Sequence, residues 1–321
     1  MKFTSLVKGA LICAAISLLP ITASAESYRL VSGPQGGNWF VLGGAFSSYF
    51  TENGVQTSAS TGGGVSNVIN IDRKKADVGF SVGSLLGAAV KGQGKFKKPV
   101  KNAVVLANLY PQVTYFILRA DFAKKHNIHT LGDALKVKDI RIGSLKPGSS
   151  SEFVVSSLLK LGYDTDWKKI KSGGGEVQFA SYSDGAGLIA DNHIDMFTFS
   201  VGQIASIVMN IESQTEVVIL PVEKQALAKL AEAYGTGTHI IKPGVYKSVT
   251  EEIPTVGDYT IAVIRKDLPD AVVKKMAETL LAKKGELTDT IKDFSSFGAE
   301  SAVSKTLPMH PAAKAYFESQ K

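Results

Sequence analysis

The chain has 321 residues, of which 20% are charged, and its formal net charge is +7. This length exceeds what one compact core usually serves, so two lobes are expected. Its lysines are scattered and no basic module studded with aromatic residues occurs, which argues against nucleic acid and favours small anions or an acidic partner.

Residues 1–25 are typical of a secretory signal peptide. Two lysines precede a largely apolar stretch, 11–20, and Ala23-Ser24-Ala25 forms an A-x-A cleavage site. The only cysteine, Cys13, lies inside this segment, so the mature chain must be held by its core rather than by disulfides. No later stretch reaches the roughly 18 apolar residues that a membrane span needs. We therefore expect a soluble protein that is exported to the periplasm and acts as a monomer.

The next segment is expected to alternate strands and helices. Asn38 is a good N-cap for a helix that begins at Trp39 and carries one apolar stripe, and Gly54 ends this helix. A β-α-β-α-β order implies a parallel sheet covered by helices. The expected elements are strands at 28–32, 55–60 and 76–82 and helices at 39–53 and 65–75.

The middle of the chain repeats this logic. Residues 91–101 read as a solvated connector, and 103–109 and 113–119 read as two strands separated by Tyr110-Pro111-Gln112. Ser149 and Glu152 have the spacing of a capping box at the start of a helix that ends before Gly162. Further strands are expected at 140–145, 170–172, 194–199 and 216–222, and further helices around 186–190, 204–209 and 227–235.

Two similar apolar strands suggest how the lobes are connected. Tyr259 to Arg265 echoes Tyr115 to Asp121, and two such strands would suit two crossings that form a hinge. The remaining segment, 271–321, has a helical pattern that Pro308 and Pro311 interrupt. The predicted division is a signal peptide at 1–25, a first lobe of residues 26–116 and 260–321, and a second lobe of residues 117–259.

Glycine-rich polar turns recur where the predicted strands end. In open α/β sheets, ligands bind beyond the carboxyl ends of the strands, and such turns expose main-chain N–H groups to an anion. Residues 60–67 and 146–151 would then form opposite walls of one cleft. The alternative is that each turn is only a flexible loop. The five turns are at 33–38, 60–67, 146–151, 172–175 and 200–202.

Catalytic alternatives have little support. The sequence has no G-x-S-x-G elbow, Walker loop or G-x-G-x-x-G stretch. Trp39 and Tyr110 stand beside the proposed cleft, where they would pack on a ligand or serve the core equally well. No catalytic residue, metal or cofactor is expected, because no cysteine or acidic cluster completes a metal site with the five histidines, His126, His129, His193, His239 and His310.

The order of the motifs along the mature chain resembles that of the TAXI-type solute receptors of TRAP transporters. The motifs are G-x-x-G-G-x-W-F-V-L-G-G at 33–44, T-G-G-G-x-S-N at 61–67, N-L-Y-P at 108–111, P-G-S-S-S at 147–151 and P-M-H-P-A-A-K-A-Y-F at 308–317. Family members usually carry tyrosines where Trp39 and Phe40 stand and a serine where Gly64 stands.

This resemblance implies an α/β, two-lobed periplasmic binding protein (type II-like), with a hinge of two crossing strands and the ligand in the interlobe cleft. It also implies that the protein captures a small carboxylate such as glutamate, 2-oxoglutarate or a related dicarboxylate. The receptor would deliver this anionic solute to the membrane permease subunits of a sodium-coupled TRAP transporter. The ligand-binding residues that the motifs imply are Gly37, Asn38, Trp39, Thr61, Gly63, Gly64, Tyr110, Gly148, Ser149 and Ser150.

Two other functions stay open at this point. A receptor for an ABC importer of another small anion would use the same fold, and a gene for an ATPase rather than for a large TRAP membrane subunit would stand beside it. A periplasmic serine hydrolase would use a serine in one of the turns and would react with an active-site serine probe.

Overall fold

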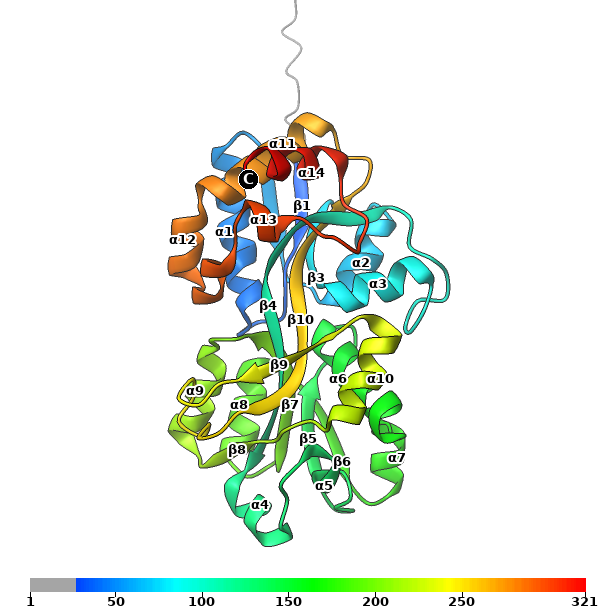
Figure 1. The fold of residues 1–321 in the computed structure, drawn as a ribbon, viewed down its shortest axis with the longest axis vertical. Helices are drawn as coiled ribbons and strands as arrows, with labels where there is room; N and C mark the ends of the chain where they lie inside the picture. Colours follow the sequence, from blue (N-terminus) through cyan, green and yellow to red (C-terminus); the bar gives the residue numbers. More distant parts are fainter. Residues whose placement is uncertain (1–26) are drawn as a thin grey trace, which may run out of the picture.

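The computed structural model describes residues 27–321, and it has two lobes that lie end to end (Figure 1). The expected signal peptide, residues 1–25, lies outside the described residues. Strands β4 (Ala103–Arg119) and β10 (Ile253–Arg265) run through both lobes. Within residues 27–321, no helix combines the length and the apolar character that crossing a membrane requires.

The first lobe, at the top of Figure 1, combines N-terminal and C-terminal segments of the chain. Its strands are β1 (Tyr28–Val31), β2 (Thr57–Ser60) and β3 (Val78–Val82). Its helices are α1 (Asn38–Glu52), α2 (Gly64–Asp72), α3 (Gly83–Lys91), α11 (Asp270–Ala282), α12 (Lys284–Thr290), η1 (Lys292–Ser296), α13 (Ala299–Ala302) and α14 (Pro311–Ser319).

The second lobe is built from the middle of the chain (Figure 1). Its strands are β5 (Arg141–Leu145), β6 (Glu176–Ala180), β7 (Met196–Gly202), β8 (Val217–Ile219) and β9 (Gly237–Ile241). Its helices are α4 (Ala120–His126), α5 (Leu131–Ala134), α6 (Ser150–Tyr163), α7 (Trp167–Ser172), α8 (Tyr182–Ala190), α9 (Ser206–Gln214) and α10 (Lys224–Tyr234).

One mixed sheet connects the two lobes. Its strand order is β2-β1-β3-β10-β4-β7-β5-β6, with β8 paired to β4 and β9 paired to β10. The pairs β1–β2, β1–β3, β5–β6 and β5–β7 are parallel, whereas β10 and β4 are antiparallel to each other and to their other neighbours. The predicted α/β class with two lobes is confirmed. The lobe boundaries at 116/117 and 259/260 stay a prediction, because β4 and β10 pass through these positions without a break.

The prediction of two separate strands at 103–109 and 113–119 was wrong, because both belong to β4. Proline cannot donate a hydrogen bond within a sheet, so the sequence reading placed a break at Pro111. In the structure β4 pairs with β10 over 103–113 and with β7 only over 112–118. Pro111 therefore lies just outside the β7 ladder, and β4 continues past it.

The third glycine turn also differs from its prediction. Residues 170–172 were expected to end a strand, but they belong to helix α7, whose N-cap Asp166 accepts a hydrogen bond from the N–H of Lys169. Gly174 has a φ of +105°, a conformation that favours glycine, and it leads the chain into β6. The turn at 173–175 thus precedes a strand and lies at the opposite end of the sheet from the other turns.

An acidic residue in β10 fastens helix α3 to the strand that connects the lobes. The Asp258 carboxylate accepts hydrogen bonds from the N–H of Tyr259 at 2.7 Å and from the N–H and hydroxyl of Ser84, near the start of α3. Burial raises the pKa of Asp258 to about 6. The folded protein therefore holds this proton more tightly than the unfolded chain does.

This pKa shift predicts a pH-dependent stability. The stabilisation is fully present below about pH 4 and is lost as the pH rises through about 6, because the unfolded carboxyl has the lower pKa. We expect the Asp258→Asn variant to lack this dependence, so that the difference between its unfolding free energy and that of the wild type changes by about 2 kcal/mol between pH 4 and pH 8. Urea denaturation at stepped pH measures it; parallel pH profiles for the two proteins would contradict the assignment.

Candidate functional site

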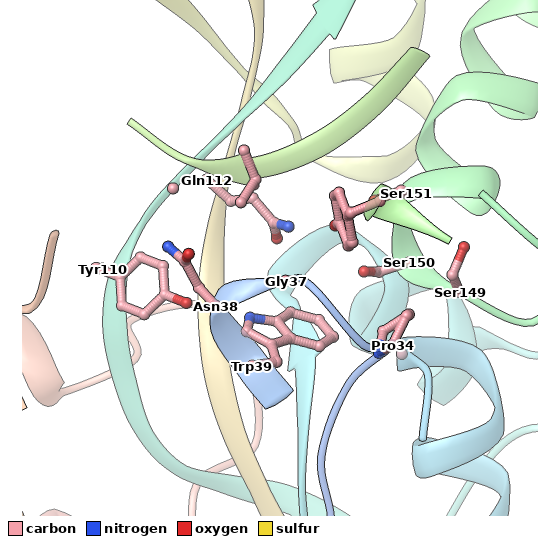
Figure 2. Close-up of a pocket in the computed structure, with 13 residues that line it drawn as sticks. Pro34, Gly37, Asn38, Trp39, Tyr110, Gln112, Ser149, Ser150 and Ser151 are labelled. Carbon is pink, nitrogen blue, oxygen red and sulfur yellow. The ribbon is translucent and has the colours of Figure 1, made fainter. Parts of the chain in front are cut away.

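A small pocket lies between the lobes where the strands of both end (Figure 2). Its lining residues come from the loop after β1, the starts of α1, α2, α6 and α8, the middle of β4 and the end of β7. They are Pro34, Gly37, Asn38, Trp39, Gly64, Tyr110, Gln112, Ser149, Ser150, Ser151, Tyr182, Val201 and Gly202. Seven of the ten predicted ligand-binding residues are among them, namely Gly37, Asn38, Trp39, Gly64, Tyr110, Ser149 and Ser150.

The other three predicted residues do not line the pocket. Thr61 is exposed, and no hydrogen bond of its side chain occurs within the described part of the chain. Gly63 and Gly148 lie in loops of opposite lobes and contact each other, since a Cβ on Gly63 would lie 2.9 Å from the carbonyl oxygen of Gly148. A binding role for these three residues stays a prediction.

The N-terminus of α2 contacts the opposite lobe directly. The N–H groups of Val65 and Ser66 both donate to the carbonyl oxygen of Gly148, at 3.1 and 3.3 Å. Gly148 can present this carbonyl because its φ is +99°, in the region that favours glycine. The sequence reading assigned these amides of the 60–67 loop to an anion, but in this structure they bind the 146–151 loop.

The N-termini of α1 and α6 keep free donors at the pocket. The first N–H groups of a helix have no partner within the helix and carry the positive end of its dipole. In α6, the Ser149 side chain caps the N–H of Glu152, which leaves the N–H groups of Ser150 and Ser151 without a partner among the described residues. The N–H groups of Asn38 and Trp39 in α1 are free in the same way within residues 27–321. Two helices from opposite lobes therefore offer four donors to this pocket.

Two side chains add buried polar atoms that lack a partner in the described structure. Tyr110 is fully buried, and its hydroxyl has no hydrogen bond, nor does the Nδ2 amide of Asn38. Figure 2 shows the Tyr110 hydroxyl beside the Asn38 side chain, near Trp39. Unsatisfied buried polar groups are uncommon in folded proteins and indicate a place where a ligand or water completes the bonds.

Trp39 packs in the core and also lines the pocket, and its contact with a ligand stays a prediction. Its ring packs on Phe80 with a centroid distance of 5.9 Å, and its indole N–H donates to the hydroxyl of Thr260 at 3.4 Å. It is 7% exposed and still lines the pocket. The side chain thus joins the first lobe's core to the hinge strand β10 and closes one side of the pocket.

The charge of the pocket comes from the main chain. None of its lining residues is a lysine, arginine, histidine, aspartate or glutamate. The free N–H groups of α1 and α6 therefore supply a positive potential at these two helix ends, which favours an anion there without a fixed cation. Of the five histidines, His310 caps α14 by accepting a hydrogen bond from the N–H of Ala312. No group of three metal-ligating side chains occurs in residues 27–321.

A buried hydroxyl network holds the second-lobe wall in place. The Tyr182 hydroxyl donates to the carbonyl oxygen of Ser200 at 2.7 Å. The Ser151 hydroxyl donates to the same carbonyl oxygen and accepts from the N–H of Ser200, both at 3.0 Å. Burial raises the pKa of Tyr182 to about 12, so its hydroxyl stays protonated. This network ties the start of α6 to the end of β7.

The pocket is nearly filled in this structure. Its cavity is about 10 Å³, which holds the centre of about one water molecule. The loop contact at Gly148 and a salt bridge of 3.3 Å between Lys95 and Glu152 both join the lobes. The lobes are therefore closed at this pocket, and a solute larger than water requires its walls to separate.

Sequence reasoning missed several residues of this site. Ser151 and Gly202 lie inside the turns at 146–151 and 200–202 but were not named as ligand-binding residues, and Gln112 directly follows the N-L-Y-P motif, so widening that motif by one residue would have included it. Tyr182 follows the strand β6, which had no predicted counterpart at 176–180. Asn67 ends the T-G-G-G-x-S-N motif but was assigned no role; its amide bonds three carbonyl oxygens and the N–H of Gly63.

Comparison with known proteins agrees with this architecture. Residues 30–320 match the NMT1-like family. No curated protein sequence matches the chain.

Solved structures share the fold at low sequence identity. The MatC protein of Rhodopseudomonas palustris with bound malate is 14% identical, with 91% of this chain and 95% of that chain covered and a TM-score of 0.54. The periplasmic binding protein BugD is 13% identical, with 92% and 93% covered and a TM-score of 0.53. An R. palustris protein with adipate is 12% identical, with 92% and 93% covered and a TM-score of 0.52. The predicted periplasmic-binding-protein fold is confirmed.

Proposed function

The chain belongs to the NMT1-like family, whose members have the periplasmic-binding-protein fold, and we propose that it captures a small carboxylate in the interlobe pocket. Its family and its structural neighbours are solute-binding proteins rather than enzymes. The solute that we propose is glutamate, 2-oxoglutarate or a related dicarboxylate. The residues that we propose to bind it are the seven predicted residues at the pocket, together with Gln112 and Ser151.

One observation carries this proposal. Helices α1 and α6 come from opposite lobes, and each has unpartnered N–H groups on residues that line the same pocket. An anion that bridges them satisfies both helix ends at once, whereas a neutral or cationic solute leaves this potential uncompensated. Free amides, the Tyr110 hydroxyl and side-chain amides are donors that suit carboxylate oxygens.

The structural neighbours support the same chemical class. MatC is described with malate, and the second R. palustris protein with adipate. Both compounds are dicarboxylates. Their binding modes belong to those proteins, and here they support only the choice of dicarboxylates as the first solutes to test.

We further propose that the receptor delivers its solute to a sodium-coupled TRAP permease. The support is the order of the TAXI-type motifs along the chain. The second candidate is a receptor for an ABC importer of another small anion, because free amides bind sulfonate oxygens as well as carboxylate oxygens. A gene for a large TRAP membrane subunit beside this gene would favour the first, and an ATPase gene would favour the second.

Titration of the purified protein tests the solute class. A dicarboxylate, 2-oxoacid or amino acid that binds at 100 times its Kd adds about 2.7 kcal/mol to the unfolding free energy. We expect this to raise the melting temperature by about 5 °C in a thermal-shift panel and to give a heat signal in calorimetry. A panel in which no carboxylate changes either readout would overturn the proposed solute class.

A further inference from the structure

A buried carboxyl group stands beside the pocket and has no cationic partner. Asp293, in η1, is 7% exposed, and its Oδ1 accepts a hydrogen bond from the N–H of Ile204 at 3.1 Å. Its other oxygen, Oδ2, is buried without a partner in the described structure. No lysine, arginine or histidine within residues 27–321 forms an ion pair with it. Burial also raises the pKa of Asp293.

The free oxygen faces the end of β7 that lines the pocket. A Cβ on Gly202 would lie 2.0 Å from Asp293 Oδ2 and 3.0 Å from Asn38 Nδ2. Gly202 and Asn38 both line the pocket. The Asp293 carboxyl group occupies the space that a side chain at position 202 would fill, so only glycine fits there. The carboxyl group therefore reaches the pocket wall.

A solute that suits this pocket meets two kinds of group. The unpartnered N–H groups of Ser150 and Ser151 suit a carboxylate at the second-lobe wall. Asp293 Oδ2 accepts hydrogen bonds and carries a negative charge when ionised, so it repels a carboxylate and attracts a donor. An unpaired buried carboxylate is costly, and a bound cation removes that cost.

We propose that Asp293 binds a protonated amine of the solute, so that the receptor selects carboxylates that also carry an amino group. This inference rests on the proposed function, because the carboxylate of the same solute is held by the helix ends. It narrows the solute from dicarboxylates in general to the amino-acid class. The malate and adipate described with the neighbouring structures carry no amine.

Matched ligand pairs test the inference on the wild-type protein. L-glutamate, 2-oxoglutarate and glutarate differ only at the carbon next to one carboxylate, as do L-aspartate, oxaloacetate and succinate. Calorimetry with each is expected to show at least about tenfold tighter binding of the amino member, the effect of one hydrogen bond between charged groups. This comparison needs no variant, so it does not depend on how a substitution affects folding.

The Asp293→Asn variant tests whether Asp293 causes the preference for solutes that carry an amino group. It keeps an acceptor for the N–H of Ile204 and removes the charge, so the amino preference is expected to fall at least tenfold while binding of the 2-oxo and unsubstituted acids is unchanged or tighter. The matched control is Asp289→Asn, a side chain that is 85% exposed in the neighbouring helix α12.

The outcomes separate the inference from the proposed function. If the wild type binds 2-oxoglutarate or glutarate as tightly as L-glutamate, the amine site is wrong and the carboxylate receptor stands. If Asp293→Asn weakens all members of a set equally, the residue supports the fold or closure and does not read the amine. If the wild type binds no carboxylate at all, the proposed function and this inference are both overturned.

Discussion

Replacing Gly64 by valine is expected to reduce the affinity for the solute at least about 100-fold, or about 2.7 kcal/mol of binding free energy. A Cβ at position 64 would lie 2.6 Å from the Cβ of Ser150 and 3.1 Å from its main-chain nitrogen. Both atoms belong to the opposite lobe, so the clash arises only when the lobes close. The solute then keeps its contacts with one helix end and loses those with the other.

The same substitution is expected to leave folding nearly unchanged. Gly64 is the first residue of α2, and valine has a better helix propensity than glycine by a few tenths of a kcal/mol. The control is Gly44→Val in α1, because a Cβ there meets nothing within 4 Å. Calorimetry measures affinity, and small-angle X-ray scattering measures whether the solute contracts the protein. A Gly64→Val variant that binds and contracts like the wild type would show that the two loops do not meet in the bound state.

Replacing Asn67 by alanine is expected to lower the unfolding free energy by about 3 kcal/mol. Its side chain is fully buried, and its Nδ2 donates to the carbonyl oxygens of Val31, Ser32 and Phe80 at 3.2, 2.7 and 2.9 Å. Its Oδ1 accepts from the N–H of Gly63 at 3.0 Å. One side chain therefore joins the ends of β1 and β3 to the loop at the pocket, and alanine leaves these groups unsatisfied.

Urea denaturation measures this loss, and a residue of the same helix provides the control. Asn70 lies in α2, and its side chain forms no hydrogen bond in the described structure, so Asn70→Ala is expected to change the unfolding free energy by less than about 0.5 kcal/mol. A loss below about 1 kcal/mol for Asn67→Ala would mean that the 60–67 loop keeps its conformation without this amide.

The local elements of the fold were predictable because each depends on nearby residues. The strand at 28–32, the helix near Asn38 and the helix after Ser149 follow from nearby residues, and each lies within two residues of its predicted start. Ser149 caps its helix as predicted, but Asn38 is the first residue of α1 rather than its N-cap, which is Gly37 and makes no side-chain hydrogen bond. Errors arose where a distant neighbour decides the outcome. Pro111 continues in a strand because β7 does not pair with it, and no pattern near Pro111 contains this information.

The site was predictable only as a set of loops. Glycine and hydroxyl residues after strands indicated which loops expose N–H groups. The motifs of the family resemblance supplied ten candidate residues in and near these loops, and seven of them line one pocket. Which amides stay free depends on the opposite lobe: the carbonyl of Gly148 binds those of α2, and those of α6 stay unpartnered. Asp293 reaches the pocket from a helical segment about 90 residues after Gly202, and an isolated aspartate in such a segment gives no signal of this position.

The paired hinge limits how the lobes move. Strands β4 and β10 hydrogen-bond to each other from the first lobe into the second, with register shifts at 260/261 and 262/263. Sliding one lobe past the other would break this ladder, whereas twisting a two-stranded ribbon preserves its bonds, and bulges increase local twist. Opening is therefore expected to follow one rotational path about the ribbon. Because a torsional hinge allows only this rotation, the N-termini of α1 and α6 separate and meet again in the same relative position in every cycle. The arrangement of donors around the solute is then reproducible even though the lobes are not fixed to each other.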